Sequence, residues 1–207
     1  SQRYDVPVLP IAQEDHQKTY ATLLNVFSEI HRIVVQKGNF PAHFQSVDQE
    51  EFYFYSGFNH QIEKQHIQFD MHSYLSKYSA IPDFSKMLVD FGLAEDSEYR
   101  KRLRENRNQA IRKLEERNKD QRHMERERLA SYGLCIGMLL FIAKTGANLD
   151  TAQQLQLDTM EILPSTQGRR FSGTKSRAGG KEVRPEFGVT FEPVFRQILE
   201  LRAWYIQ

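Results

Sequence analysis

The sequence has almost no net charge, a single cysteine and no long apolar run. Its 207 residues carry a formal net charge of +1, so only the local distribution of charge can favour nucleic acid. Cys135 is the one cysteine; it cannot form an internal disulfide, which suits a reducing compartment. Because buried free cysteine packs as a small hydrophobe, we expect Cys135 in the core.

The longest apolar run, residues 134–143, is too short to cross a bilayer. No signal peptide is recognisable either, so we expect a cytoplasmic protein, associated with the nucleoid when bound to DNA, and no membrane partner. The chain begins at Ser1 and ends at Gln207 inside a predicted helix. We therefore expect an excised or processed fragment of a longer protein.

Apolar residues at steps of three and four predict most of the helices, and prolines and glycines predict where they end. The predicted helices span residues 14–37, 82–91, 98–130, 132–145, 149–157 and 191–205. A short antiparallel strand pair is expected on either side of residues 176–181. The expected fold class is mainly α with a small antiparallel β-hairpin, that is, α+β.

Residues 39–79 carry a less regular pattern. The aromatic block EEFYFYSGF at 50–58 is typical of a short strand or of an apolar face wrapped by loops. His60, His66 and His72 recur every six residues, but six residues turn a helix by roughly 600°, so successive histidines fall on different faces. We therefore expect no metal site there, and no cofactor.

The predicted helix at 98–130 holds more bases than acids. Arg112, Lys113 and Arg117 are candidates for contacts to DNA phosphates, because release of counterions drives such binding. Two alternatives stay open: a solvated helix laced by charge pairs, and a coiled-coil arm for protein partners.

The next predicted helix is apolar on all sides from Leu134 to Ile142, which predicts a central position in the fold. It is expected to stop at Gly146, and Asn148 or Asp150 can cap the helix that follows.

A basic hairpin is predicted near the end of the chain. Arg169, Arg170 and Lys175 precede the adjacent glycines Gly179 and Gly180, which adopt a tight turn without steric hindrance. Arg177 lies in this turn and Lys181 follows it. The spacing of Gly168 and Gly173 is that of a phosphate-binding loop, but Thr174 separates glycine from lysine and no apolar strand precedes it.

Taken in order, residues 139–183 resemble the first half of the catalytic domain of tyrosine recombinases, the phage integrase superfamily. That family has Thr-Gly-x-Arg-x-x-Glu between two helices, and then a strand pair whose turn presents a catalytic lysine. Here Thr145 and Gly146 match, whereas Asn148 stands at the arginine position and Thr151 at the glutamate position. The resemblance covers about residues 129–201.

The resemblance implies transfer of a DNA phosphoryl group to a tyrosine, with Lys175 acting on the leaving oxygen and Lys181 as the fallback. Asn148 would donate to the phosphate without bringing a charge. The family's His-x-x-Arg helix and nucleophilic tyrosine have no counterpart in this sequence. The chain alone is therefore expected to be catalytically inactive.

The expected partner is double-stranded DNA, held by Arg169, Arg170, Arg177, Lys181 and the bases of the long helix, with self-association in a recombination complex as a further expectation. The expected segments are an N-terminal extension and helix (1–38), a helical insertion or DNA-binding region (39–130) and a partial recombinase-like domain (131–207). Two other functions stay open: a catalytically degenerate DNA-binding accessory protein, and a helical protein-interaction module.

Overall fold

The computed structural model describes residues 12–55, 61–64, 67–93, 98–147, 161–165, 168–175, 181–183 and 186–207. Helices dominate these residues and the strands are short and antiparallel, so the predicted α+β class is confirmed. The helices are α1 (Gln13–Val34), α2 (Met71–Leu75), α3 (Phe84–Phe91), α4 (Glu98–Lys119), α5 (Met124–Thr145), the 3-10 turn η3 (Val189–Phe191) and α7 (Glu192–Ile206). The strands are β1 (Ala42–Gln45), β2 (Glu51–Phe54), β3 (Gln61–Lys64), β4 (Ile67–Asp70), β5 (Glu161–Ser165), β6 (Gly168–Lys175), β7 (Lys181–Val183) and β8 (Glu186–Phe187).

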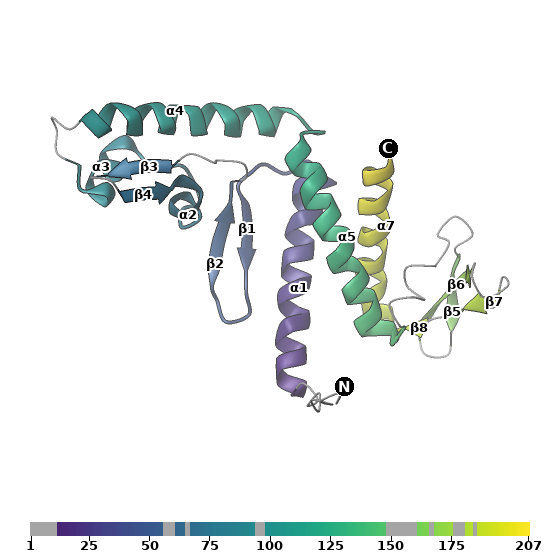
Figure 1. Ribbon diagram of the computed structural model, residues 1–207. Coiled ribbons are helices and arrows are strands. Elements are labelled where there is room, and N and C mark those ends of the chain that lie inside the picture. Colours follow the sequence, from purple (N-terminus) through teal and green to yellow (C-terminus); the bar gives the residue numbers. More distant parts are fainter. Residues whose placement is uncertain are drawn as a thin grey trace, which may run out of the picture.

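Three long helices, α1, α5 and α7, lie side by side and form the larger part of the core (Figure 1). Their contact is close because two glycines of α5 face the neighbouring helices. A Cβ added at Gly133 would stand 2.7 Å from Leu201 and 2.8 Å from Ile30, and one at Gly137 would stand 2.9 Å from Ile198. The backbone of α5 therefore approaches α1 and α7 more closely than larger residues would permit.

Helix α4 extends sideways from the end of this layer at which α5 begins, and lies above the β3–β4 pair and helices α2 and α3 (Figure 1). A second hydrophobic cluster forms beneath it, from Tyr55, Met71, Leu75, Met87, Phe91, Leu103 and Ala110. Leu114 of α4 packs against both clusters. The two cores are thus joined at the end of α4 that lies nearest to α5.

The single helix predicted over residues 98–130 is wrong. α4 ends at Lys119 and α5 begins at Met124. Two polar side chains in the corner satisfy backbone donors: Asp120 Oδ1 accepts from the Arg122 N–H at 2.9 Å, and His123 Nδ1 accepts from the Glu125 N–H at 3.2 Å. Capping of this kind ends one helix and starts the next without proline or glycine.

The predicted helices at 14–37, 82–91 and 191–205 correspond to α1, α3 and α7, with ends that differ by a few residues. The helix predicted at 132–145 is the second part of α5, and that predicted at 149–157 lies outside the described residues. The aromatic block contributes strand β2, which pairs with β1, as one of its two interpretations expected.

Cys135 is exposed, so its predicted burial is wrong. The predicted central position of this helix agrees with the packing of α5 between α1 and α7, but one face of α5 is open: Tyr132 and Leu139 are 64% and 48% exposed. Only the side of α5 that carries Gly133, Gly137 and Leu140 is buried against α1 and α7. Apolar composition indicated a core helix but did not indicate which of its faces is covered.

Candidate nucleic-acid interface

The predicted basic hairpin is present in the backbone. Strands β6 and β7 pair antiparallel, with Gly173 opposite Val183, Thr174 opposite Glu182 and Lys175 opposite Lys181. Lys175 is the last residue of β6 and Lys181 the first of β7. The register thus brings the two lysines that the sequence singled out to the same end of the hairpin. Arg177, in the segment between the strands, lies outside the described residues.

Arg169 and Arg170 belong to the first half of β6, which has partners on both sides. Arg169 is opposite Pro164 of β5 and Phe187 of β8, and Arg170 is opposite Leu163 and Glu186. These two additional strands were not predicted. β6 is therefore the central strand of a small sheet, and the lysine-bearing hairpin is its extension.

The sheet is attached to the helical layer through β8. Phe187 is buried and its ring lies 5.6 Å from Phe191 and 5.2 Å from Phe195, measured between ring centroids. Phe195 in turn stacks on Phe141 of α5 at 5.5 Å. A chain of aromatic contacts thus connects the sheet to α5 and α7, which fixes the base from which the hairpin extends.

The Thr-Gly pair is the end of α5, as predicted. Gly146 has a φ of +64° and donates its N–H to the carbonyl of Ile142 at 2.9 Å. Thr145 Oγ1 donates to the Phe141 carbonyl at 2.8 Å and accepts from the Ala147 N–H at 3.2 Å. Glycine is favoured at a left-handed cap, so local structure accounts for both residues. Asn148 lies outside the described residues.

The three predicted phosphate contacts of α4 do not share one environment. Arg112 is exposed and Lys113 is half-buried. Arg117 is only 5% exposed, and its Nη1 donates to the carbonyl of Tyr55 at 2.8 Å. Burial lowers the pKa of the Arg117 guanidinium from its ordinary value, and the charges of Glu125 and Glu116 act in the opposite direction. Arg117 joins α4 to the segment after β2, so its assignment as a surface contact to DNA is corrected.

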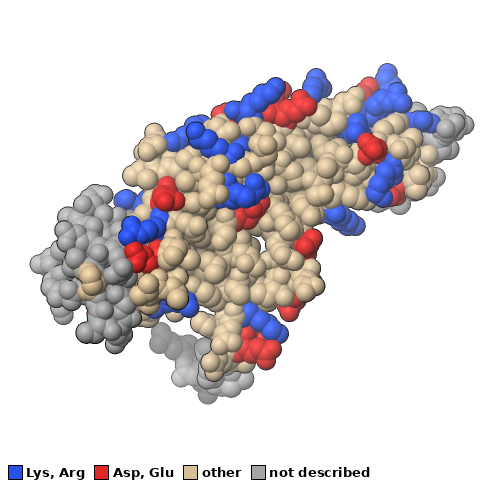
Figure 2. All heavy atoms as spheres, turned by 180° about the vertical axis from the view of Figure 1, so that it is seen from behind, with Lys and Arg blue, Asp and Glu red and all other residues tan. Residues whose placement is uncertain are grey.

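The hairpin and α4 are not brought together. Figure 1 shows the sheet beyond one end of the α1, α5 and α7 layer, whereas α4 extends sideways from the other end. Seen from behind, Lys and Arg side chains recur along the upper edge of the molecule with a few acids between them (Figure 2). The described residues thus carry two separate candidate surfaces.

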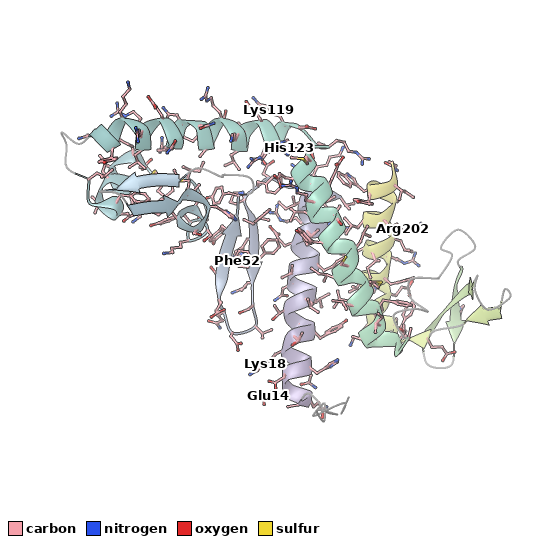
Figure 3. The ribbon with its side chains drawn as sticks, in the orientation of Figure 1. Glu14, Lys18, Phe52, Lys119, His123 and Arg202 are labelled. Carbon is pink, nitrogen blue, oxygen red and sulfur yellow. The ribbon has the colours of Figure 1, made fainter. Side chains whose placement is uncertain are left out.

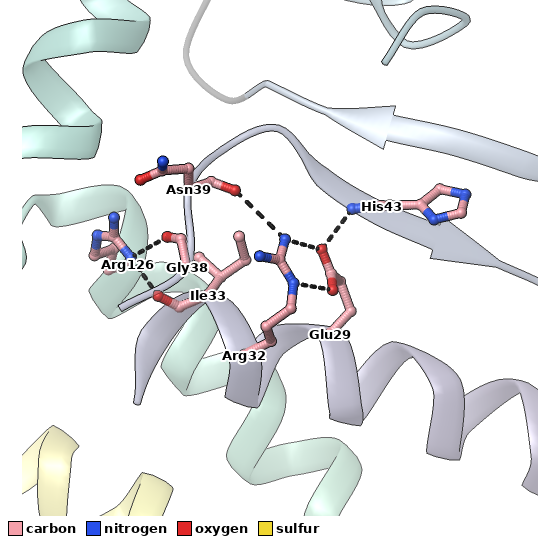
Figure 4. A network of polar contacts seen from close by, with 7 residues as sticks. All are labelled: Glu29, Arg32, Ile33, Gly38, Asn39, His43 and Arg126. Atoms are coloured by element: carbon pink, nitrogen blue, oxygen red, sulfur yellow. Dashed lines mark hydrogen bonds and ion pairs between the residues drawn. The ribbon is translucent and has the colours of Figure 1, made fainter. Parts of the chain in front are cut away.

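The structure also contains a polar network that sequence reasoning missed (Figure 4). Arg126 is fully buried; its Nη1 donates to the carbonyls of Ile33 and Gly38, and its guanidinium lies over the ring of Phe40. Burial lowers the pKa of Arg126 from its ordinary value. Because its partners are carbonyl groups in the last turn of α1 and in the turn that follows, Arg126 holds the end of α1 against the start of α5. No sequence signal separates such an arginine from a solvated one.

A polar hollow of about 450 Å³ lies between α1, β1 and α7. Its acid, Glu29, already accepts from Arg32 Nε at 2.6 Å and from the His43 N–H at 2.7 Å. The more buried of its two histidines, His31, is hydrogen-bonded through Nε2 to Glu200 Oε2 at 2.7 Å. The charged groups of the hollow are thus engaged within the protein.

Neither a metal site nor a membrane segment gains support from the packing. Among the described residues no three metal-ligating side chains converge; His72 is described, and His60 and His66 lie outside the described residues. By length and composition alone, α5 would suffice to cross a bilayer. Its continuous apolar run, residues 134–143, is shorter than a bilayer requires. Of the most apolar 18-residue segment of α5, 33% is buried inside the protein. Packing against α1 and α7 accounts for the apolar residues on the covered side of α5.

No protein-family model, no curated protein and no solved structure matches this chain.

Proposed function

We propose that this chain is part of a site-specific tyrosine recombinase of the phage integrase type, which binds duplex DNA and takes part in its recombination. The observation that carries the proposal is the β6–β7 register, with Lys175 opposite Lys181 at one end of a hairpin. The order of elements also supports it: a core helix ending in Thr145-Gly146, then the sheet with its hairpin, then α7.

In the proposed reaction a tyrosine oxygen attacks a DNA phosphorus, and the 5′ oxygen of the next nucleotide leaves. Lys175 would supply positive charge or a proton at that leaving oxygen, where charge develops. Arg169 and Arg170 would hold the flanking phosphates. The nucleophilic tyrosine is not assigned to this chain, so the chain by itself binds DNA without cutting it.

Asn148 favours a second candidate, a catalytically degenerate accessory protein. It stands where the family has arginine, and an amide brings no charge to a phosphate. Loss of a charge-assisted hydrogen bond removes about 1.5–3 kcal/mol. Such a protein would bind DNA at the same hairpin and differ only in chemistry.

The exposed face of α5 favours a third candidate, a protein-interaction module. Tyr132, Cys135 and Leu139 follow one another along that face at helical spacing and all are exposed. This candidate predicts no binding of DNA.

A double variant of the hairpin tests the proposal. In Lys175→Gln with Lys181→Gln, two charges are removed where the phosphate is expected, so affinity for a labelled duplex should fall about tenfold or more at low salt. Fluorescence anisotropy measures the affinity.

The matched control is Lys18→Gln with Lys77→Gln. Both lysines are exposed and lie on α1 and after α2, so this variant removes the same net charge away from the sheet. Its affinity should stay within about threefold of the parent, because distant exposed charges are screened. Equal losses in the two variants would contradict the assignment of the hairpin.

A further inference from the structure

The packing of α4 defines its outward face. Leu103, Ala110 and Arg117 are buried beneath the helix, and they recur at steps of seven residues, which keeps them on one side. The opposite side is solvent-exposed from Lys101 to Lys119, and α4 forms the upper edge of the molecule (Figure 3).

The centre of that outward face is basic. At 100° per residue, Lys101, Asn108, Arg112 and Lys119 lie within roughly 20° of one line, on the side opposite Ala110. All four are exposed. From Lys101 to Lys119 this line covers about 27 Å, at 1.5 Å per residue. We call these four residues the outer ridge of α4.

The bases of the outer ridge are unpaired. Within the part of the chain that the structure describes, the side chains of Lys101, Arg112 and Lys119 form no ion pair and no hydrogen bond. The exposed acids of the helix, Glu105 and Glu115 among them, lie roughly 40° or more to either side of the line. The outermost atoms of α4 therefore present positive charge and amide donors, and the acids form its shoulders.

We infer that the outer ridge of α4 binds the phosphate backbone of duplex DNA, as a second contact surface separate from the hairpin. This inference rests on the proposed function. The structure selects Lys101 and Lys119 from among the bases of the long helix, whereas Arg117 is excluded by its burial.

The chemistry of the outer ridge selects the partner. Its residues are lysine, asparagine and arginine, with no apolar side chain, whereas protein interfaces have an apolar, often aromatic, core. Duplex DNA offers one negative charge per about 1.7 Å of its axis, so a straight row of bases meets a phosphate at any register. Binding of this kind positions the duplex without reading its sequence.

The test compares three variants of the chain on one labelled duplex at several salt concentrations. The ridge variant, Lys101→Gln with Lys119→Gln, should bind about tenfold or more weakly at low salt, and the slope of log affinity against log salt should become shallower by about 2. The hairpin variant and the Lys18→Gln with Lys77→Gln control are measured in parallel.

The outcomes distinguish failure of the ridge from failure of the proposed function. A weaker hairpin variant with a ridge variant that behaves like the control would overturn the ridge and leave the proposed function standing. A parent that does not bind DNA would overturn both. A weaker ridge variant with an unchanged salt slope, or equal competition by polyglutamate of the same charge, would overturn the assignment to phosphate. Because the two surfaces are far apart (Figure 1), losses of binding free energy in the combined variant should add.

Discussion

Helices α4 and α5 are both 22 residues long, follow each other directly and use their side chains in opposite ways. α4 is rich in charge, yet a single buried stripe of Leu103, Ala110 and Arg117 fixes its orientation. α5 is apolar on nearly every side, yet only one side is covered. The buried residues of α4 thus lie along one line, whereas apolar residues of α5 lie on its covered and its exposed sides alike.

Small residues indicate which face of α5 is packed, which hydrophobicity alone does not. On α5 the buried side is marked by Gly133 and Gly137, where Leu201, Ile30 and Ile198 come closer than 3.0 Å to the position that a Cβ would occupy. Leu139 and Leu140 are neighbours of the same type, but one is 48% exposed and the other is fully buried. Glycine spacing, rather than apolar content, indicates the packed face.

The largest expected effect contrasts these two leucines. Leu140→Ala should lower the free energy of unfolding by about 2–5 kcal/mol, because it opens a cavity in the core. Leu139→Ala should change it by no more than about 0.5–1 kcal/mol, because half of that side chain already contacts solvent. Chemical denaturation followed by circular dichroism measures both. Equal losses would mean that the outer face of α5 is covered in solution, which would contradict the comparison.

A smaller effect is expected from filling the glycine contact. Gly133→Val should lower the free energy of unfolding by about 1–3 kcal/mol, because the added carbons collide with Leu201 and Ile30. Ala143→Val, at an exposed position of the same helix, controls for the weaker helix propensity of valine and should cost about 0.5 kcal/mol. If the two substitutions had the same effect, close approach at Gly133 would not be what sets the packing of α5.

The sequence predicted those elements whose pattern is local. Apolar spacing predicted α1, α3 and α7, and Thr145-Gly146 predicted the end of α5. The hairpin followed from Gly179 and Gly180 between two short basic segments. In each case the chemistry that defines the element lies within a few residues of it.

Long-range contacts explain what could not be predicted. The corner between α4 and α5 depends on the side chains of Asp120 and His123, which also occur inside helices. Arg117 and Arg126 can be buried because carbonyl groups some 60 to 90 positions earlier in the chain accept hydrogen bonds from them. Strands β5 and β8 form because β6 offers them a partner. None of these partners is visible in a local pattern.

The salt dependence of duplex binding is the decisive test of DNA recognition by this chain. We predict that the unmodified chain binds a labelled duplex at low salt with little sequence preference. We also predict that log affinity falls linearly with log salt, with a slope of about 0.9 for each phosphate contacted. Absence of binding at low salt, or an affinity indifferent to salt, would contradict DNA recognition and favour a protein partner at the exposed face of α5.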